Sequence, residues 1–345
     1  MSYFRLSFIM TAICVAIAGW WGSQNGMGVM TALWLVLVLG VLEVSLSFDN
    51  AVVNAGVLKD MDEFWRQMFL TVGILVAVFG MRLVFPIVIV AVAADMSVGP
   101  VIDMALTDPD QYGKILTDCY PAIAAFGGMF LLLVFLAFLF DHERDLHWLG
   151  AFEERLAGLG KVDNIAIICA LGVLLSMQWF LPAELHLRVL SAGLAGVILF
   201  IAVDSLDSVF DVDEGEGATI GAAKRSGIAA FMYLEVLDAS FSFDGVIGAF
   251  AITRDVVIIM LGLAIGAMFV RSMTVYLVHK GTLDEYVFLE HGAHYAIGAL
   301  AFIMLAGTVV HIPEVITGLV GVGFIALSLY SSVRHRKTAA AAAAQ

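Results

Sequence analysis

Long apolar runs separated by short polar segments dominate the sequence. Ten such runs can be marked, at residues 4–21, 29–58, 68–94, 121–140, 164–181, 187–206, 227–250, 255–279, 291–310 and 313–333. A helix that crosses the hydrocarbon core of a bilayer needs about 20 mostly apolar residues. The pattern therefore predicts an all-α polytopic membrane protein with about ten transmembrane helices. The second and third runs are longer than one crossing needs, which predicts a tilt or a break in each.

Composition supports a lipid bilayer as the solvent of this chain. Hydrophobic residues make up 61% of it and charged residues 14%, whereas soluble domains are nearer half apolar and one quarter charged. This excess excludes a soluble enzyme and a disordered chain. The net charge of −14 would repel a phosphate backbone, so no nucleic-acid partner is expected. Nothing in the sequence specifies an oligomer.

Lysine and arginine are divided unevenly between the two sides that ten spans would create. Twelve fall on the side of the N terminus, three on the other side and two inside spans. Cytoplasmic loops carry the excess of basic residues in membrane proteins. Both termini are therefore predicted to be cytoplasmic, with the chain integral to the inner membrane of a bacterial cell. The first run could instead be a signal peptide, because small residues precede Trp20, but the charge division favours an uncleaved span.

Three segments outside the runs carry weaker signals. The outward-facing segment 95–120 is rich in aspartate and is expected to be a solvated loop, or alternatively a local field that attracts cations. The leucine spacing in 141–163 suits a short amphipathic helix on the membrane surface or a plain connector. Residues 338–345 are low in complexity and are predicted to be a disordered tail, which leaves 1–337 as a single membrane domain.

Two segments of the chain resemble each other. Residues 43–50 read Glu-Val-Ser-Leu-Ser-Phe-Asp-Asn, and residues 238–245 read Asp-Ala-Ser-Phe-Ser-Phe-Asp-Gly. In each half the next run contains one arginine, Arg82 or Arg271, nine residues after a glycine. Each half therefore has a span with two carboxylates followed by a span with a buried arginine.

The span count also gives the relative direction of the two halves. Repeat one covers about 29–140 and repeat two about 227–310, with linking spans at 164–206 and a last span at 313–333. The two carboxylate spans are five crossings apart, so they run in opposite directions. Inverted repeats of this kind are common in secondary transporters, whose ion sites lie near the bilayer midplane where helices break.

Ionisable side chains inside the runs are the strongest functional signal. Each costs roughly 2.5–3.5 kcal/mol at mid-bilayer on insertion scales. The repeats contain five carboxylates, which are Glu43, Asp49, Glu235, Asp238 and Asp244, against the two charge-pairing arginines Arg82 and Arg271. The surplus carboxylates must be protonated or neutralised by a cation. A purely structural network of acid–arginine pairs is the alternative.

Spacing predicts how these carboxylates could meet. Glu43 and Asp49 are six residues apart, about 240° on an unbroken helix, so they would not share a face. Ser, Asp and Asn compete for backbone hydrogen bonds and Gly loosens a helix, so we expect a break or kink near Asp49 and another near Asp244. The candidate ligands are all oxygens, and Asn50, Asn54, Ser47 and Ser242 join the carboxylates. Such ligands suit Mg²⁺, Ca²⁺ or Mn²⁺.

These two motifs resemble the paired motifs of the TerC family of integral membrane proteins, which are grouped with the LysE-type transporters. The similarity covers about 33–95, 120–140 and 227–310, including an arginine after each motif and the segment 289–298 (Leu-Glu-His-Gly-Ala-His-Tyr-Ala-Ile-Gly). The additional spans and the acidic segment leave a divergent branch open. The family is linked to manganese export and to tellurium resistance, and the resemblance implies those functions here. Gly245 replaces Asn50 in the second half, so the halves cannot supply identical ligands.

Together these observations predict a transporter, not an enzyme, that exports a divalent cation, with Mn²⁺ favoured and Ca²⁺ as the alternative. The metal is cargo, and no permanent cofactor is expected. Asp49 and Asp244 are predicted as central ligands, with Asp238, Glu43, Asn50 and Glu235 completing or flanking them. Three functions compete with this one: a Ca²⁺/H⁺ or other cation exchanger, a scaffold that delivers metal to secreted proteins, and an intramembrane aspartyl protease. The last is disfavoured because the sequence lacks the Gly-x-Gly-Asp motif of such proteases.

Overall fold

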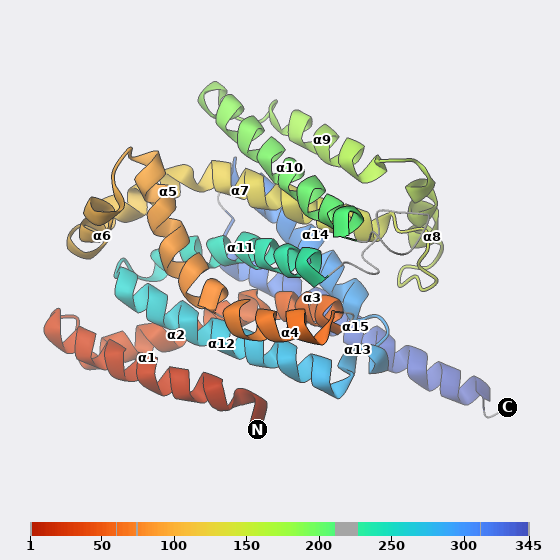
Figure 1. The fold of residues 1–345 in the computed structure, drawn as a ribbon, viewed down its shortest axis with the longest axis horizontal. Helices are drawn as coiled ribbons and strands as arrows, with labels where there is room; N and C mark the ends of the chain where they lie inside the picture. The colour runs from red at the N-terminus through yellow and green to blue at the C-terminus, as the bar shows by residue number, and fades with distance from the viewer. Residues whose placement is uncertain (1, 60, 74, 211–226, 311, 344–345) are drawn as a thin grey trace.

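The protein is an all-α polytopic membrane protein. A computed structural model describes residues 2–59, 61–73, 75–210, 227–310 and 312–343, and every regular element in that part is helical (Figure 1). The principal helices are α1 (Arg5–Gln24), α2 (Val29–Leu46), α3 (Phe48–Lys59), α4 (Glu63–Met68), α5 (Phe85–Ala93), α6 (Val98–Thr107), α7 (Pro109–Leu139), α8 (Ala151–Ala157), α9 (Ile165–Met177), α10 (His186–Phe210), α11 (Gly227–Ile252), α12 (Val256–Lys280), α13 (Thr282–Glu285), α14 (Leu289–Gly307) and α15 (Glu314–Ala343).

Five short elements complete the chain. Two of them, η2 (Phe69–Gly73) and η3 (Val76–Val84), have π-helical geometry, which is rare and often found at functional sites. The others are 3₁₀ turns, η1 (Ser2–Phe4), η4 (Gly158–Lys161) and η5 (Ala183–Leu185). The third predicted run, 68–94, is therefore helical throughout its described part but changes helix type before α5.

Eight of the described helical segments are long and apolar enough to cross a membrane, and a bent pair raises the number to nine. In that pair α9 follows α8 and η4 at an angle of 101°. With 13 residues, α9 is shorter than the predicted span 164–181 and covers only about 20 Å. Helix α11 has the length of a span, 26 residues, and differs from the others by its three carboxylates.

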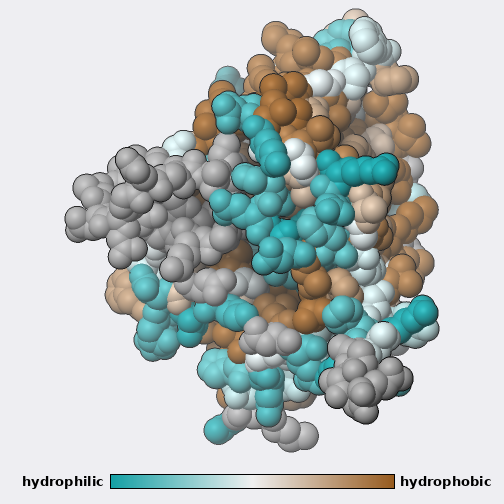
Figure 2. Space-filling view, turned by 90° about the vertical axis from the view of Figure 1, so that its right-hand side faces the viewer, coloured by the Kyte–Doolittle hydropathy of each residue, from teal (hydrophilic) through white to brown (hydrophobic). Residues whose placement is uncertain are grey.

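The two ends of the bundle differ from its flanks. In Figure 1 the long helices cross the picture roughly in one direction, with α6 at one end and α8 and α13 at the other. Figure 2 looks onto the end with α8 and α13, where hydrophilic residues gather, while a hydrophobic flank extends along the side. This division is that of a bundle with an apolar belt and a polar face in water.

The helices of each repeat pack against helices of the other repeat. Helix α2 packs against α12, and reciprocally α11 packs against η3. Helix α3 packs against α14, and reciprocally α11 packs against α7. The third helices of the repeats, α7 and α14, also pack together. Each first helix therefore contacts the second and third helices of the other repeat, which is the pattern that two interlocked copies produce.

Small residues allow α2 and α12 to approach closely. Gly262 and Gly266 are one turn apart on α12, and Gly40 lies opposite them on α2. A methyl group added at Gly266 would collide with the Glu43 side chain and with the Gly40 carbonyl. Paired small residues of this kind bring helix backbones together in membranes. Here they bring the backbone carrying Glu43 directly against α12.

Of the two predicted helix breaks, the structure contains the first. Helix α2 ends at Leu46 and α3 begins at Phe48, with a bend at Ser47 beside Asp49. The second break is absent, because α11 continues through Asp244. Low-dielectric surroundings leave a freed backbone group unsatisfied, so a helix stays closed unless side chains or a cavity replace the lost bonds.

Two predictions for the outer segments need correction, those for 95–120 and for the tail. Segment 95–120 is mostly α6 and the first turns of α7, so it is helical and not a loop. Segment 141–163 contains the short helices α8 and η4, in agreement with the short helix predicted there. The tail is helical as far as Ala343 because its alanines, the strongest helix formers, extend α15.

Buried polar contacts join the segment that precedes α8 to α8 itself and to α14. Arg144 donates to Glu153 at 2.8 Å, and the backbone N–H of Leu149 donates to the same carboxylate at 3.0 Å. His291 lies 2.9 Å from the Leu146 carbonyl. Burial lowers the pKa of the Arg144 guanidinium, and the Glu153 carboxylate opposes that change. These contacts give His291 a structural partner at the start of its helix.

Candidate functional site

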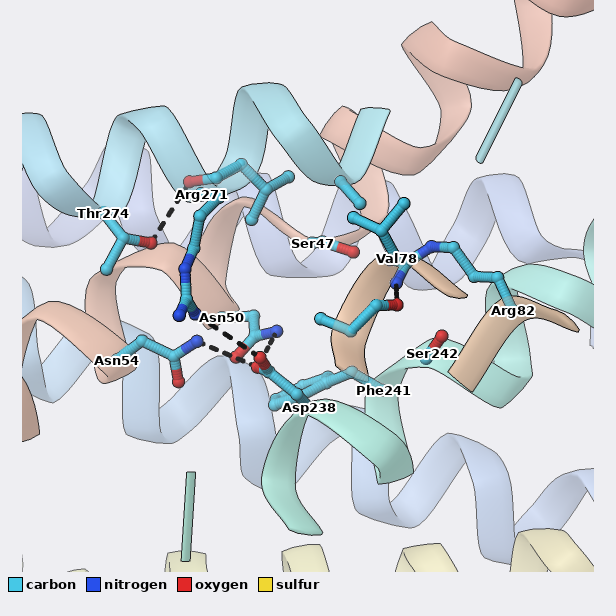
Figure 3. Close-up of a pocket in the computed structure, with 13 residues that line it drawn as sticks. Ser47, Asn50, Asn54, Val78, Arg82, Asp238, Phe241, Ser242, Arg271 and Thr274 are labelled. Carbon is cyan, nitrogen blue, oxygen red and sulfur yellow. Dashed lines mark hydrogen bonds and ion pairs between the residues drawn. The ribbon is translucent and has the colours of Figure 1, made fainter. Parts of the chain in front are cut away.

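A small polar cavity lies where the broken helix of repeat one meets α11 and α12 of repeat two (Figure 3). Its volume is about 30 Å³, enough for an ion or one to two waters. The lining side chains come from α3, η3, α11 and α12, together with Ser47 at the break: Ser47, Asn50, Asn54, Ala77, Val78, Arg82, Asp238, Phe241, Ser242, Ala267, Val270, Arg271 and Thr274.

Asp238 is held at the centre of this cavity by two amides. Asn50 and Asn54 lie one turn apart on α3, and each donates its side-chain N–H to Oδ1 of Asp238 at 2.8 Å. Side chains four residues apart share one face of a helix, so both reach the same oxygen. Two hydrogen bonds to one oxygen fix the direction of this carboxylate.

Arg271 of α12 approaches the other oxygen of Asp238. Its Nη1 lies 3.9 Å from Oδ2, which is an ion pair without a hydrogen bond. The guanidinium also lies 3.5 Å above the ring of Phe69, an arrangement that stabilises a cation. Its Nε and Nη2 have no hydrogen-bond partner. The Arg271–Asp238 pair is therefore loose, although both side chains are buried.

Arg82 forms a tighter pair in the first repeat. It donates to Oε1 of Glu43 and to the Ala77 carbonyl. Ser47 donates to the same Glu43 oxygen at 3.1 Å, and Glu43 is only 1% exposed. Each arginine therefore lies against the carboxylate that begins the repeated motif in its own half, Glu43 in one and Asp238 in the other.

Glu235 lies next to this site without a hydrogen-bond partner in the described part of the chain. It is 8% exposed, and neither of its carboxylate oxygens accepts a hydrogen bond there. Glycine at position 73 makes room for it, because a Cβ there would lie 2.5 Å from Oε1 of Glu235 and 3.0 Å from Nη2 of Arg271. Glu235 and Arg271 therefore face the same small space beside η2.

The predicted central pair is not brought together among the described side chains. Asp49 is buried but is not in the cavity lining, and its Oδ2 faces Gly321 of α15. It accepts the backbone N–H of Asn50 at 3.0 Å. The Asp244 side chain lies outside the described residues. Of the predicted ligands, Asn50 and Asp238 meet in the cavity, and Glu43 borders it through Arg82.

The cavity presents oxygen atoms that have no other partner. Oδ1 of Asn50, Oδ1 of Asn54 and the Ser242 hydroxyl are buried without a hydrogen bond. Amide, hydroxyl and carboxylate oxygens are the ligands that hard divalent cations prefer. Among the described residues no three His, Cys, Asp or Glu side chains are grouped closely enough to hold a metal together. In this arrangement the guanidinium groups contact the carboxylates that a metal would use.

Sequence reasoning missed Thr274, Phe69 and the role of Gly73. Thr274 lines the cavity one turn after Arg271 and donates to the Val270 carbonyl. The sequence shows the nine-residue spacing from Gly73 to Arg82. It does not show that Arg271, the arginine of the other repeat, lies in the space beside Gly73. Cross-repeat contacts of this kind leave no local pattern.

Comparison of the sequence with known proteins identifies its family. No curated protein and no solved structure matches the chain. A family whose description reads "Protein of unknown function (DUF475)" matches residues 48–339, which include α3, both arginines and α11 and begin just after the bend at Ser47. Because that match covers well over half of the sequence, the chain belongs to the DUF475 family.

Proposed function

We propose that the protein is a transporter of divalent metal cations that exports Mn²⁺ from the cytoplasm. The observation that supports this most is the excess of buried acid at the repeat interface. Glu43, Asp49, Glu235 and Asp238 are all buried, and only the first and last are paired with arginines among the described residues. Two of these four carboxylates are thus left without an arginine, and one divalent cation would balance both.

The location of this acid also supports transport over a static structural role. Asp238, the amides of Asn50 and Asn54 and the break at Ser47 come together at the interface between the repeats, around a cavity of ion size. Transporters bind substrate at such interfaces, where broken helices expose polar groups. Cation binding at Asp238 would use the free amide oxygens of Asn50 and Asn54, with water completing about six oxygen ligands.

The resemblance to the TerC family favours Mn²⁺ over Ca²⁺. A Ca²⁺/H⁺ exchanger uses the same ligand types and is the nearest alternative. A scaffold that delivers metal to secreted proteins would not need a buried ion-sized cavity. An aspartyl protease would have no use for Arg82 and Arg271.

The proposal is tested by metal flux into proteoliposomes that contain a metal-sensitive dye. The wild-type protein should transport Mn²⁺, and Asp49→Asn and Asp244→Asn should abolish transport while leaving the protein folded. Asp103→Asn, at an exposed position on α6, is the matched control and should transport normally. Absence of Mn²⁺ and Ca²⁺ flux in the wild type would contradict the proposal and favour the scaffold. Normal flux in both neutral variants would remove those residues from the site.

We further propose that both termini are cytoplasmic, in the inner membrane of a bacterium. The 12-to-3 division of basic residues supports this, as does the separation of α6 from α8 and α13 at opposite ends of the bundle (Figure 1). A reporter that is active only in the cytoplasm, fused after Gln345, should be active. Activity of a periplasmic reporter at that position would show the opposite orientation or a different number of crossings.

A further inference from the structure

The arrangement of Arg271 between two carboxylates suggests a role that differs from that of Arg82. Arg82 is bound on two sides, by Glu43 and by a backbone carbonyl. Arg271 is held at 3.9 Å from Asp238 and leaves Nε and Nη2 free. The first arginine is fixed, whereas the second can change partners with a small movement.

A second partner for Arg271 is already in place. Glu235 and Asp238 are three residues apart on α11, so they share one face of that helix. Among the described residues neither Glu235 oxygen has a hydrogen-bond partner, and Oε1 faces the same space at Gly73 as Nη2 of Arg271. The guanidinium also lies over the face of the Phe69 ring, a cation–π contact that involves neither carboxylate.

We infer that Arg271 is a tethered cation that neutralises Asp238 in the empty protein and moves to Glu235 when a divalent cation takes its place. This inference rests on the proposed function and assigns Glu235 a positioning role in place of the role of a metal ligand. A divalent ion at Asp238 repels the guanidinium at close range, since two like charges a few ångströms apart interact strongly in low dielectric. Glu235 offers the displaced charge a buried counter-charge and so lowers the cost of cation binding.

The consequence is a specific coupling between the two side chains. Without Glu235, Arg271 has only Asp238 as a carboxylate partner in this region and competes more strongly with the metal. Without Arg271, no guanidinium competes with the metal for Asp238. Removing Glu235 should then have little effect on metal binding. A direct ligand would behave differently, because removing it weakens metal binding whether or not Arg271 is present.

A double-mutant cycle on the purified full-length protein separates these cases, with Mn²⁺ binding measured by equilibrium dialysis. Glu235→Gln should weaken binding about tenfold in the wild-type background, which corresponds to about 1.4 kcal/mol. Arg271→Gln should strengthen binding, and adding Glu235→Gln to it should change binding little. Equal losses in both backgrounds would show that Glu235 acts on the ion directly and would overturn the inference.

A second pair of variants covers the case in which Arg271→Gln does not fold. Gly73→Ala places a methyl group between Glu235 and Arg271 without removing a charge and should weaken Mn²⁺ binding as Glu235→Gln does. Gly80→Ala is the matched control, since the nearest neighbouring side-chain atom there is 3.5 Å away, and it should bind normally. Wild-type binding by Gly73→Ala would contradict the exchange.

A measurement without metal distinguishes failure of the exchange from failure of the proposed function. In the Asp238→Asn background Arg271 depends on Glu235 alone, so adding Glu235→Gln should lower the apparent Tm in detergent clearly more than it does in the wild type. If the wild-type protein binds no divalent cation but the loss of Tm is larger in the Asp238→Asn background, the proposed function is refuted. The change of partner by Arg271 would still hold. Equal losses of Tm in both backgrounds would refute the exchange itself.

Discussion

Arg82→Gln is expected to destabilise the protein by about 3–5 kcal/mol, the usual cost of removing one partner from a buried ion pair. Glu43 is almost fully buried between α2 and α12, and Arg82 is its only ion-pair partner among the described residues. Without that guanidinium, Glu43 keeps only the Ser47 hydroxyl. The loss should be visible as a lower apparent Tm in detergent and as reduced yield from membranes.

Two further variants show whether the charge is the cause. Glu43→Gln combined with Arg82→Gln removes both charges and should recover much of the lost stability. Arg254→Gln removes a guanidinium that is 57% exposed and 4.0 Å from the exposed Asp110, so it should cost less than about 1 kcal/mol. If Arg82→Gln unfolds at the wild-type temperature, the pair does not stabilise the repeat interface.

Asp238→Asn is expected to abolish Mn²⁺ transport and to leave the protein folded. The amide is similar in size to the carboxylate, and its oxygen can accept from Asn50 and Asn54, which now hold Oδ1 of Asp238. Arg271 retains Glu235 nearby, so no buried guanidinium is left without a counter-charge. The charge that attracts the metal, however, is gone. Flux in proteoliposomes and Tm in detergent measure the two effects separately.

The position of Asp238 explains why its substitution should reduce transport more than substitution of a neighbouring side chain such as Asn54. It is the one carboxylate in the described lining of the cavity. Asn54→Ala is a useful comparison, because it removes one of the two amides on Oδ1 and should weaken transport without abolishing it. Wild-type flux in Asp238→Asn would move the substrate site away from this cavity.

Much of the helical architecture was predictable from the chain. Runs of apolar residues long enough to cross a bilayer leave few alternatives to a helix, because backbone groups in hydrocarbon must be satisfied within their own segment. The burial of Glu43, Asp238, Arg82 and Arg271 also followed, since all four lie inside such runs. The bend at Ser47 was predicted from side chains that compete for backbone hydrogen bonds.

The same local signal failed in the second repeat. Ser-Phe-Asp occurs at 47–49 and at 242–244, yet only the first is bent and α11 stays continuous. Propensities of single residues are small compared with packing and with the cost of an unsatisfied backbone group in the membrane. Identical tripeptides therefore adopt different structures in the two halves.

By itself, the sequence determined the membrane environment, the helical class and the set of charged residues that must be accommodated inside the bundle. Each of these follows from composition and from periodic patterns along one segment. Only the tertiary structure decided which charges meet: Glu43 with Arg82, Asp238 with two asparagines and loosely with Arg271, and Asp49 toward α15 outside the cavity lining. These pairings depend on how the repeats interlock and on close approach at Gly73 and Gly266. Contacts between segments some 200 residues apart are set by packing in three dimensions, which local spacing does not encode.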